Sequence, residues 1–226
     1  MMEYTLIQVK NEIKSALIDK GIEVDEGLTE YAKYINRIGN TMLNISFGES
    51  TLKTFSLPNL SVDTCREMFF NCTALTTVDY FDTSSATDMY QMFYHCTALT
   101  DVAQFDTRNV TNMYQVFAYC TSITSVPLLD ASKVELIADP FYQCAKLTDV
   151  GGFRNLGKVR DMQDGVRHIA PPNITRESLL NIINNLYDRA AAGYPTNWIS
   201  ISQNIISKLN DDEIAMLIRK GWVLYT

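Results

Sequence analysis

Residues 92–106 read MFYHCTALTDVAQFD, and the same pattern recurs in residues 68–82, 116–130 and 140–154. Its apolar letters keep their columns in all four copies, although the letters between them change. Such regular self-similarity is typical of repeat folds, in which one repeat buries its apolar face only against its neighbours. Five columns carry the pattern: Cys72, Cys96, Cys120, Cys144; Phe69, Phe93, Phe117, Phe141; Leu75, Leu99, Ile123, Leu147; Val78, Val102, Val126, Val150; and Phe81, Phe105, Leu129, Phe153.

Each repeat contains two segments with different spacing. Residues 99–105 have an apolar residue at every third position and predict a short strand, which pairs in parallel with the strands of neighbouring repeats. Residues 110–117 have apolar residues spaced by three and four, which favours a helical turn or a short 3₁₀ helix capped by Thr111. We therefore predict an α/β fold, a short right-handed solenoid of about five coils of the leucine-rich-repeat type.

The repeat extends slightly beyond its four clear copies. Cys65 precedes Met89 by the same interval that separates Cys72 from Cys96. A partial coil is therefore predicted over residues 52–68, with Cys65 in a core column. In the fourth coil one extra residue near Gly157 shifts the expected matches to Val159 and Met162.

The ends of the repeat region divide the chain into three predicted segments: an N-terminal helical element at 1–40, the solenoid at 41–168 and a small α/β cap at 169–226. The first segment has two amphipathic stripes, which fit either a cap on the open end of the solenoid or a docking element for a partner. In the last, helices are predicted over 175–192 and from the Asn210–Glu213 capping box to about Gly221. Strands are predicted at 198–201 and 222–225.

The MF-x-x-C repeat, best seen in residues 68–75 and 92–99, resembles the BspA-like leucine-rich-repeat proteins. Residues 171–186 and 208–222 are similar to a segment that follows such repeats in proteins of gut Bacteroidales and their phages. Residues 13–35 resemble a helical element at the start of phage tail and baseplate proteins. The resemblance implies surface recognition or virion structure without catalysis, and it names no ligand.

Charge and hydropathy exclude several partners. The net charge is −7, which argues against binding to duplex nucleic acid or to anionic lipid headgroups, because both need a surplus of Lys and Arg. No stretch approaches the roughly 20 apolar residues of a membrane span, and the first residues do not read as a signal peptide. We expect that the chain is synthesised in a bacterial cytoplasm and that it does not insert into a membrane.

The cysteines and histidines are the first candidates for chemistry. Cysteines that recur once in every repeat among apolar columns predict free, buried thiols, although neighbouring coils bring such residues within disulfide range. Zinc needs ligands that converge, which this spacing does not supply. His95 lies in a variable column and is expected at the surface, and neither it nor His168 belongs to a recognisable catalytic constellation. We expect no cofactor and no enzymatic activity.

Two further columns have a structural and a functional interpretation. Asp82, Asp106 and Asp130 are followed by Thr or Ala and then Ser or Arg, which favours an Asx turn after the strand over a calcium site. Tyr90 and Tyr114 share a column, which fits packing between coils or, alternatively, contact with a sugar or a protein.

The predicted function is that of a non-enzymatic binding or structural protein. The first hypothesis is a phage virion component of the tail, baseplate or fibre, acting in assembly or host contact, and in a virion we expect it to be oligomeric. The alternatives are a bacterial cell-surface adhesin module and a carbohydrate-binding accessory. A protein, or alternatively a glycan, is the expected partner. The candidate binding surface consists of the residues between core positions of the strand segments, with the tyrosine column: Thr76, Thr77, Thr100, Asp101, Thr124, Ser125, Thr148, Asp149, Tyr90 and Tyr114.

Overall fold

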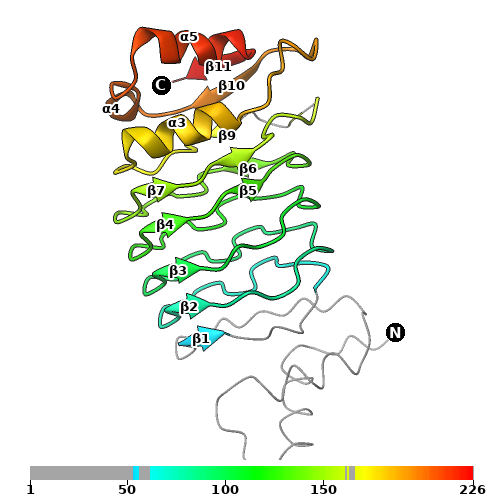
Figure 1. Ribbon diagram of the computed structural model, residues 1–226. Helices are drawn as coiled ribbons and strands as arrows, with labels where there is room; N and C mark the ends of the chain where they lie inside the picture. Colours follow the sequence, from blue (N-terminus) through cyan, green and yellow to red (C-terminus); the bar gives the residue numbers. More distant parts are fainter. Residues whose placement is uncertain (1–52, 56–61, 161, 163–165, 226) are drawn as a thin grey trace, which may run out of the picture.

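The computed structural model describes residues 53–55, 62–160, 162 and 166–225. Figure 1 shows the repeats as layers lying one above another, with β1 at one end and α5 and β11 at the other. The helical element predicted at 1–40 lies outside the described residues, and the division into three segments stays a prediction.

Parallel pairing joins equivalent strands of successive repeats. The register pairs Thr77 with Asp101 and Leu129 with Phe153, so each residue pairs with its equivalent in the next repeat. The predicted parallel strands and the α/β mixture are confirmed, although each strand of a repeat has only two residues. These strands are β1 (Thr54–Phe55), β2 (Thr77–Val78) and β3 (Asp101–Val102) in one sheet, β4 (Ser125–Val126) with β7 (Asp149–Val150), and β5 (Leu129–Asp130) with β8 (Phe153–Arg154).

A second, longer sheet connects the last repeats to the C-terminal segment. Its order is β11-β10-β9-β6, formed by β6 (Ile137–Ala138), β9 (Val166–Arg167), β10 (Asn197–Ser200) and β11 (Trp222–Tyr225), all parallel. Ile137 pairs with Val166, which lies more than one repeat period further along the chain, so the match predicted for Met162 is wrong. The insertion in the fourth coil is therefore longer than the single residue that the apolar spacing suggested.

The short 3₁₀ helix predicted at 110–117 does not form, because residues 114–119 make turns and alternate amides of the segment bond to the next repeat. The amides of Met113, Gln115 and Phe117 donate to carbonyls of residues 136, 138 and 140. Gln115 has φ 50° and Tyr119 has φ 63°, left-handed values that interrupt a right-handed helix. Equivalent residues in the other repeats share this conformation: Glu67, Asn71, Gln91, His95, Asp139 and Gln143.

The core is a set of stacked columns between the layers. The rings of Phe69, Phe93 and Phe117 lie nearly parallel, with 5.2 Å between the centroids of successive rings. Phe141 continues the stack at 6.0 Å from Phe117. The buried hydroxyls are satisfied as well, since Thr83 donates to the carbonyl of Asp106 at 2.9 Å. All five repeated apolar columns predicted from the sequence are buried.

The cysteines form one of these buried columns and are free thiols. Cys96, Cys120 and Cys144 each donate an S–H···O hydrogen bond of 3.0 Å to the carbonyl of a phenylalanine in the preceding repeat. Cys65 is fully buried in its predicted core column. Burial raises the pKa of Cys144 to about 12 and also raises the pKa of Cys65. These sulfurs therefore serve as small apolar core groups.

This environment predicts that the thiols resist modification in the folded protein. At pH 8 a pKa near 12 leaves Cys144 with about a thousandfold less thiolate than a thiol with the ordinary pKa of 9.0 would have. We expect Ellman's reagent to label almost no thiol in native protein, and to label five after unfolding in guanidinium without reductant. Rapid labelling of native protein would contradict the buried column, and a count below five in the unfolded state would indicate a disulfide.

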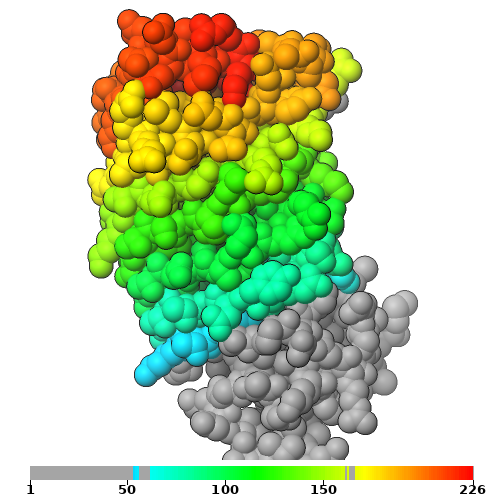
Figure 2. Space-filling view, viewed as in Figure 1, coloured from blue at the N-terminus to red at the C-terminus, as the bar shows by residue number. Residues whose placement is uncertain are grey.

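The C-terminal segment covers the end of the repeats. Helix α3 (Arg176–Asn185) begins at the Thr175 N-cap, and the hydroxyl of Ser178 accepts a hydrogen bond from the Val150 amide and donates one to Asp149. The helix thus caps the edge of β7 where the next repeat strand would lie. Figure 2 shows this segment packed directly on the repeats. The helix ends at residue 185, earlier than predicted, because Leu186 takes an extended conformation.

The remaining C-terminal elements largely follow the prediction. Helix α5 (Asp211–Arg219) starts with the predicted capping box between Asn210 and Glu213. Strands β10 and β11 lie within one residue of the predicted positions. The short helix α4 (Gln203–Ile206) was not predicted. None of the helices in the described part of the chain has the length and apolar character to cross a bilayer.

Candidate functional site

The strand-face residues form an exposed strip along the sheets β1–β3 and β4–β7. All eight predicted residues lie at the surface: Ser125 is half-buried, and Thr76, Thr77, Thr100, Asp101, Thr124, Thr148 and Asp149 are exposed. Their inward neighbours, such as Val78 and Val102, are buried. The alternation arises because successive strand residues point to opposite faces. The structure therefore places this half of the predicted surface on one face of stacked strands.

Hydrogen bonds between repeats hold this strip in place. The Thr76 hydroxyl donates to the carbonyl of Lys53 at 2.9 Å, and the Thr100 hydroxyl donates to the carbonyl of Thr76 at 3.1 Å. Within its own strand, the carboxylate of Asp101 accepts from the amide of Val102 at 2.9 Å. The side chains that face solvent are thus preorganised, which lowers the entropy lost when a partner binds.

The strip is not equally open along its length. The carboxylate of Asp149 accepts a hydrogen bond of 2.9 Å from the Ser178 hydroxyl of α3. The amide of Thr175 donates to the carbonyl of Thr148 at 2.9 Å. The C-terminal cap therefore engages the last pair of strand-face residues, and the part open to a partner runs from Thr76 to Ser125.

Tyr90 and Tyr114 lie on a different part of the repeat. Their rings stack at 5.3 Å with an interplanar angle of 10°, and the guanidinium of Arg66 lies 4.0 Å from the centre of the Tyr90 ring. Their column is continued by Ala138 of β6, whereas the threonine and aspartate columns belong to the other sheets. Packing between coils, one of the two interpretations of this column, is confirmed. The sequence grouped these tyrosines with a strip to which they do not belong.

A second line of aromatic side chains was not included in the predicted surface. Phe70 stacks on Tyr94 at 5.1 Å, Tyr94 contacts Tyr119 at 5.2 Å, and Tyr119 contacts Tyr142 at 5.3 Å. Ala118 occupies the position where the repeat would place the third ring, and the neighbouring residue Tyr119 supplies the ring instead. The signal was present as aromatic residues just before each cysteine, but the one-residue offset hid the continuity.

The two histidines lie at the surface, as expected for His95. The Nδ1 atom of His95 is 3.1 Å from the Asn71 side-chain oxygen, in the same variable column. The Nδ1 atom of His168 is 2.7 Å from a carboxylate oxygen of Asp139. Both histidines are exposed and both have left-handed backbone conformations. These contacts link neighbouring repeats at their turns.

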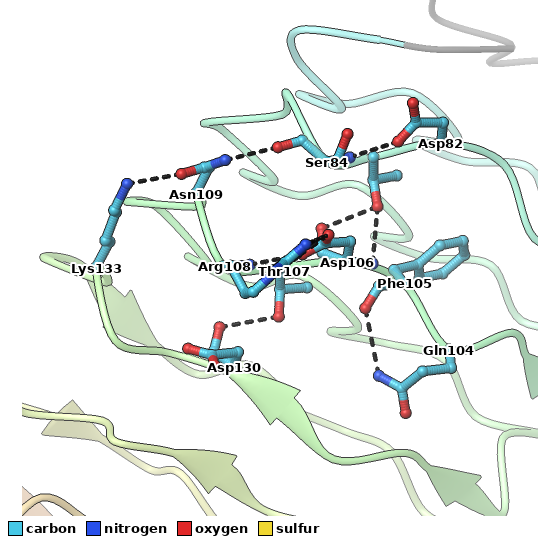
Figure 3. Close-up of polar contacts among 11 residues, drawn as sticks. Asp82, Ser84, Gln104, Phe105, Asp106, Thr107, Arg108, Asn109, Asp130 and Lys133 are labelled. Atoms are coloured by element: carbon cyan, nitrogen blue, oxygen red, sulfur yellow. Dashed lines mark hydrogen bonds and ion pairs between the residues drawn. The ribbon is translucent and has the colours of Figure 1, made fainter.

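The aspartate column forms the predicted turns. In Figure 3 the Asp82 carboxylate accepts from the amide of Ser84 at 2.9 Å, and Asp106 accepts in the same way from the amide of Arg108. Asp130 accepts likewise from the amide of Ser132. This confirms the Asx-turn interpretation. Arg108 also forms a bidentate ion pair with Asp106. Its hydrogen bonds hold the pKa of the Asp106 carboxyl below its usual range.

The outer edge of the same turns carries a short chain of amide and amine contacts. The Asn109 side chain donates to the carbonyl of Ser84 at 2.7 Å and accepts from Lys133 Nζ at 2.6 Å (Figure 3). These bonds connect three consecutive repeats. In the described residues, no group of three or more His, Cys, Asp or Glu side chains is placed to hold a metal ion.

Comparison with known proteins identifies one family. Residues 61–174 match the family model described as Mycoplasma protein of unknown function, DUF285. The matched region covers the repeats and ends just before α3. Neither a curated protein nor a solved structure gave a significant match to the chain.

Proposed function

Since this chain belongs to the family described as Mycoplasma protein of unknown function, DUF285, we propose that it is a non-enzymatic binding protein that recognises a protein partner through its strand face. The observation that carries the proposal is the preorganised strip from Thr76 to Ser125, whose side chains face solvent from consecutive repeats. Solenoids use such surfaces for recognition.

We further infer that the repeats form a short leucine-rich-repeat-type solenoid of the BspA-like kind. The strand register, which pairs each residue with its equivalent in the next repeat, supports this assignment, as do the inward columns of cysteine, phenylalanine and leucine. The spacing between equivalent side chains then equals the separation of paired strands, about 4.8 Å. A partner that presents an extended segment or a flat sheet would match this spacing.

The packing of the aromatic rings against neighbouring side chains favours a protein partner over a glycan. Sugars bind aromatic side chains through the faces of the rings. Arg66 occupies one face of Tyr90 and Tyr114 stacks on the other. Tyr94 has Phe70 stacked on one face and Tyr119 in edge contact. Tyr90 therefore offers a partner mainly its ring edge and hydroxyl group, which suit the mixed polar and apolar contacts of protein interfaces.

The strip itself provides the test of recognition. We expect Asp101→Lys combined with Thr124→Lys to reduce binding of the labelled full chain to its target at least about tenfold, because two lysines replace small polar groups at the centre of the interface. Glu135→Lys, which changes an exposed residue just before β6, is the matched control and should keep binding. Equal loss in the control, or no loss in the double variant, would overturn the role of the strip.

For the place of action, we propose a phage virion, with a bacterial cell-surface adhesin as the alternative. The proposal rests on the resemblance of both ends of the chain to phage and Bacteroidales proteins. Antibodies against the purified chain should label particles isolated from the producing culture in immuno-electron microscopy. Labelling of intact cells instead would favour the adhesin, and labelling of neither would contradict both. A glycan array with specific hits would favour the carbohydrate-binding alternative.

A further inference from the structure

The end of the molecule formed by α5 and β11 leaves a strand edge open. Strand β11 is the outermost strand of its sheet, and no other strand in the described part of the chain pairs with its outer side. The amides of Asn197 and Ile201 donate to the carbonyls of Gly221 and Tyr225. Because backbone groups alternate in direction along a strand, those of Trp222 and Leu224 face the open edge. Figure 1 places this edge at the end of the stack farthest from β1.

Exposed apolar side chains concentrate at this same end. Five large hydrophobic residues are exposed in the described chain, and three of them belong to α5 and β11: Ile218 at 58%, Val223 at 51% and Tyr225 at 67%. The other two, Tyr80 and Tyr142, lie in different repeats. Such a concentration beside an open strand edge marks an interaction surface.

The exposed flank of α5 faces away from α3. On its other flank, Glu213 forms an ion pair with Arg176 of α3, and Lys220 donates to the carbonyls of Ile183, Asn184 and Leu186 at the end of α3. An α-helix turns by about 100° per residue, so Ile218 lies about 140° around the helix axis from Glu213 and about 160° from Lys220. Ile218 therefore projects away from α3, beyond the last layer of the stack.

We propose that this end is the interface of a two-fold homodimer, in which β11 pairs antiparallel with β11 of a second copy. Trp222 of each copy then exchanges backbone hydrogen bonds with the partner's Leu224, and one continuous sheet runs through both subunits. Val223 meets the partner's Val223 on one face of this sheet. On the other face the two α5 helices run antiparallel, with Ile218 of each between them.

The charges of α5 favour a second copy as the occupant. The helix starts with the exposed carboxylates Asp211 and Asp212 and ends with the exposed Arg219. An antiparallel arrangement about Ala215 places Asp211 opposite the partner's Arg219, twice by symmetry. The surface is thus complementary to itself in charge, in backbone donors and acceptors and in apolar side chains, which is the requirement of a two-fold interface. Pairing also closes the open edge and stops at two subunits.

Sedimentation equilibrium of the full chain at low salt tests the dimer. We expect the wild type to dimerise, and Asp211→Arg or Arg219→Asp alone to raise the dimer Kd at least about tenfold, since each converts two attractive pairs into two repulsive ones. An equimolar mixture of the two variants restores both pairs and should dimerise about as well as the wild type. Tyr80→Lys, which changes an exposed aromatic residue elsewhere, should leave the Kd unchanged.

Several results would overturn the proposal. The first is a wild-type monomer at all concentrations, because no second copy would then pair with the open edge of β11. The second is a dimer whose Kd is the same in the wild type and in both charge variants, which would place the interface elsewhere. Hydrogen exchange of the wild type supplies a measurement that does not depend on variants: protection of the Leu224 amide should rise with protein concentration. Protection that is independent of concentration would contradict the pairing.

Discussion

Replacement of Arg189 by methionine is expected to lower the free energy of unfolding by about 4 kcal/mol, because it removes a buried guanidinium that donates to the backbone carbonyls of four residues. Only 1% of Arg189 is exposed. Its guanidinium donates to the carbonyls of Gly157, Val159 and Arg160 at 2.7, 3.0 and 2.8 Å, and to that of Pro195 at 3.0 Å. Methionine keeps the apolar stem but leaves these oxygens without the donors they have now.

Arg189 lies at the junction between the repeats and the C-terminal cap, so its replacement also affects the packing there. Residues 157–160 leave the last repeat, and the Trp222 ring packs against Gly157, where a Cβ atom would lie 2.2 Å from the ring. The Trp222 side chain also donates to the carbonyl of Tyr187 at 3.1 Å. Loss of the guanidinium should therefore loosen the contact between this loop and β11.

Unfolding in guanidinium chloride, followed by tryptophan fluorescence, measures the change in the free energy of unfolding. Arg189→Lys should recover only part of the stability, because a single ammonium group cannot reproduce the planar fork of donors. Arg154→Met is the matched control on an exposed arginine, and we expect a change within about 0.5 kcal/mol. A loss below about 1 kcal/mol in Arg189→Met would show that water replaces the donors and that the network has little energetic weight.

Phe93→Ala should destabilise the protein by about 3 to 5 kcal/mol, since it empties the centre of the phenylalanine stack. The ring of Phe93 is fully buried and lies between Phe69 and Phe117, with centroid distances of 5.2 Å to each. Phe105 contacts it from the side at 6.0 Å. Truncation therefore removes contacts to both neighbouring repeats together.

In a repeat fold this change also weakens the coupling between neighbours. We expect the thermal transition of Phe93→Ala to broaden, because the repeats on either side lose the ring that connects them. Phe93→Leu keeps most of the volume and should cost less than half as much. Tyr80→Ala, which truncates a ring that is 49% exposed, is the control. Equal effects of Phe93→Ala and Tyr80→Ala would contradict the importance of the stack.

The inward columns could be predicted because burial imposes a strict period on the sequence. Cys72, Cys96 and Cys120 stay in register since every repeat must fill the same layer, and a shift would expose apolar groups. The Asx turns at Asp82 and Asp106 were equally predictable, because that hydrogen bond forms between near neighbours in the chain. The capping box at Asn210 is local in the same way.

Features that depend on the neighbouring repeat were not predictable. The spacing of residues 110–117 suggested a helix, but alternate amides bond to the next repeat and Gln115 turns left-handed. The aromatic line is continuous only because Tyr119 reaches the place of Ala118, which is a matter of three-dimensional distance. The same holds for the pairing of Ile137 with Val166.

The sequence by itself therefore determined the length of a repeat, the inward columns, the strand-face residues and the main C-terminal elements. Periodic burial and local capping leave a direct trace in residue order. Only the tertiary structure decided which surface residues share a face, how α3 engages Asp149, and that Arg189 lies inside the protein. These features arise from contacts between residues far apart in the chain. The identity of a single arginine or tyrosine does not indicate which distant residues it contacts.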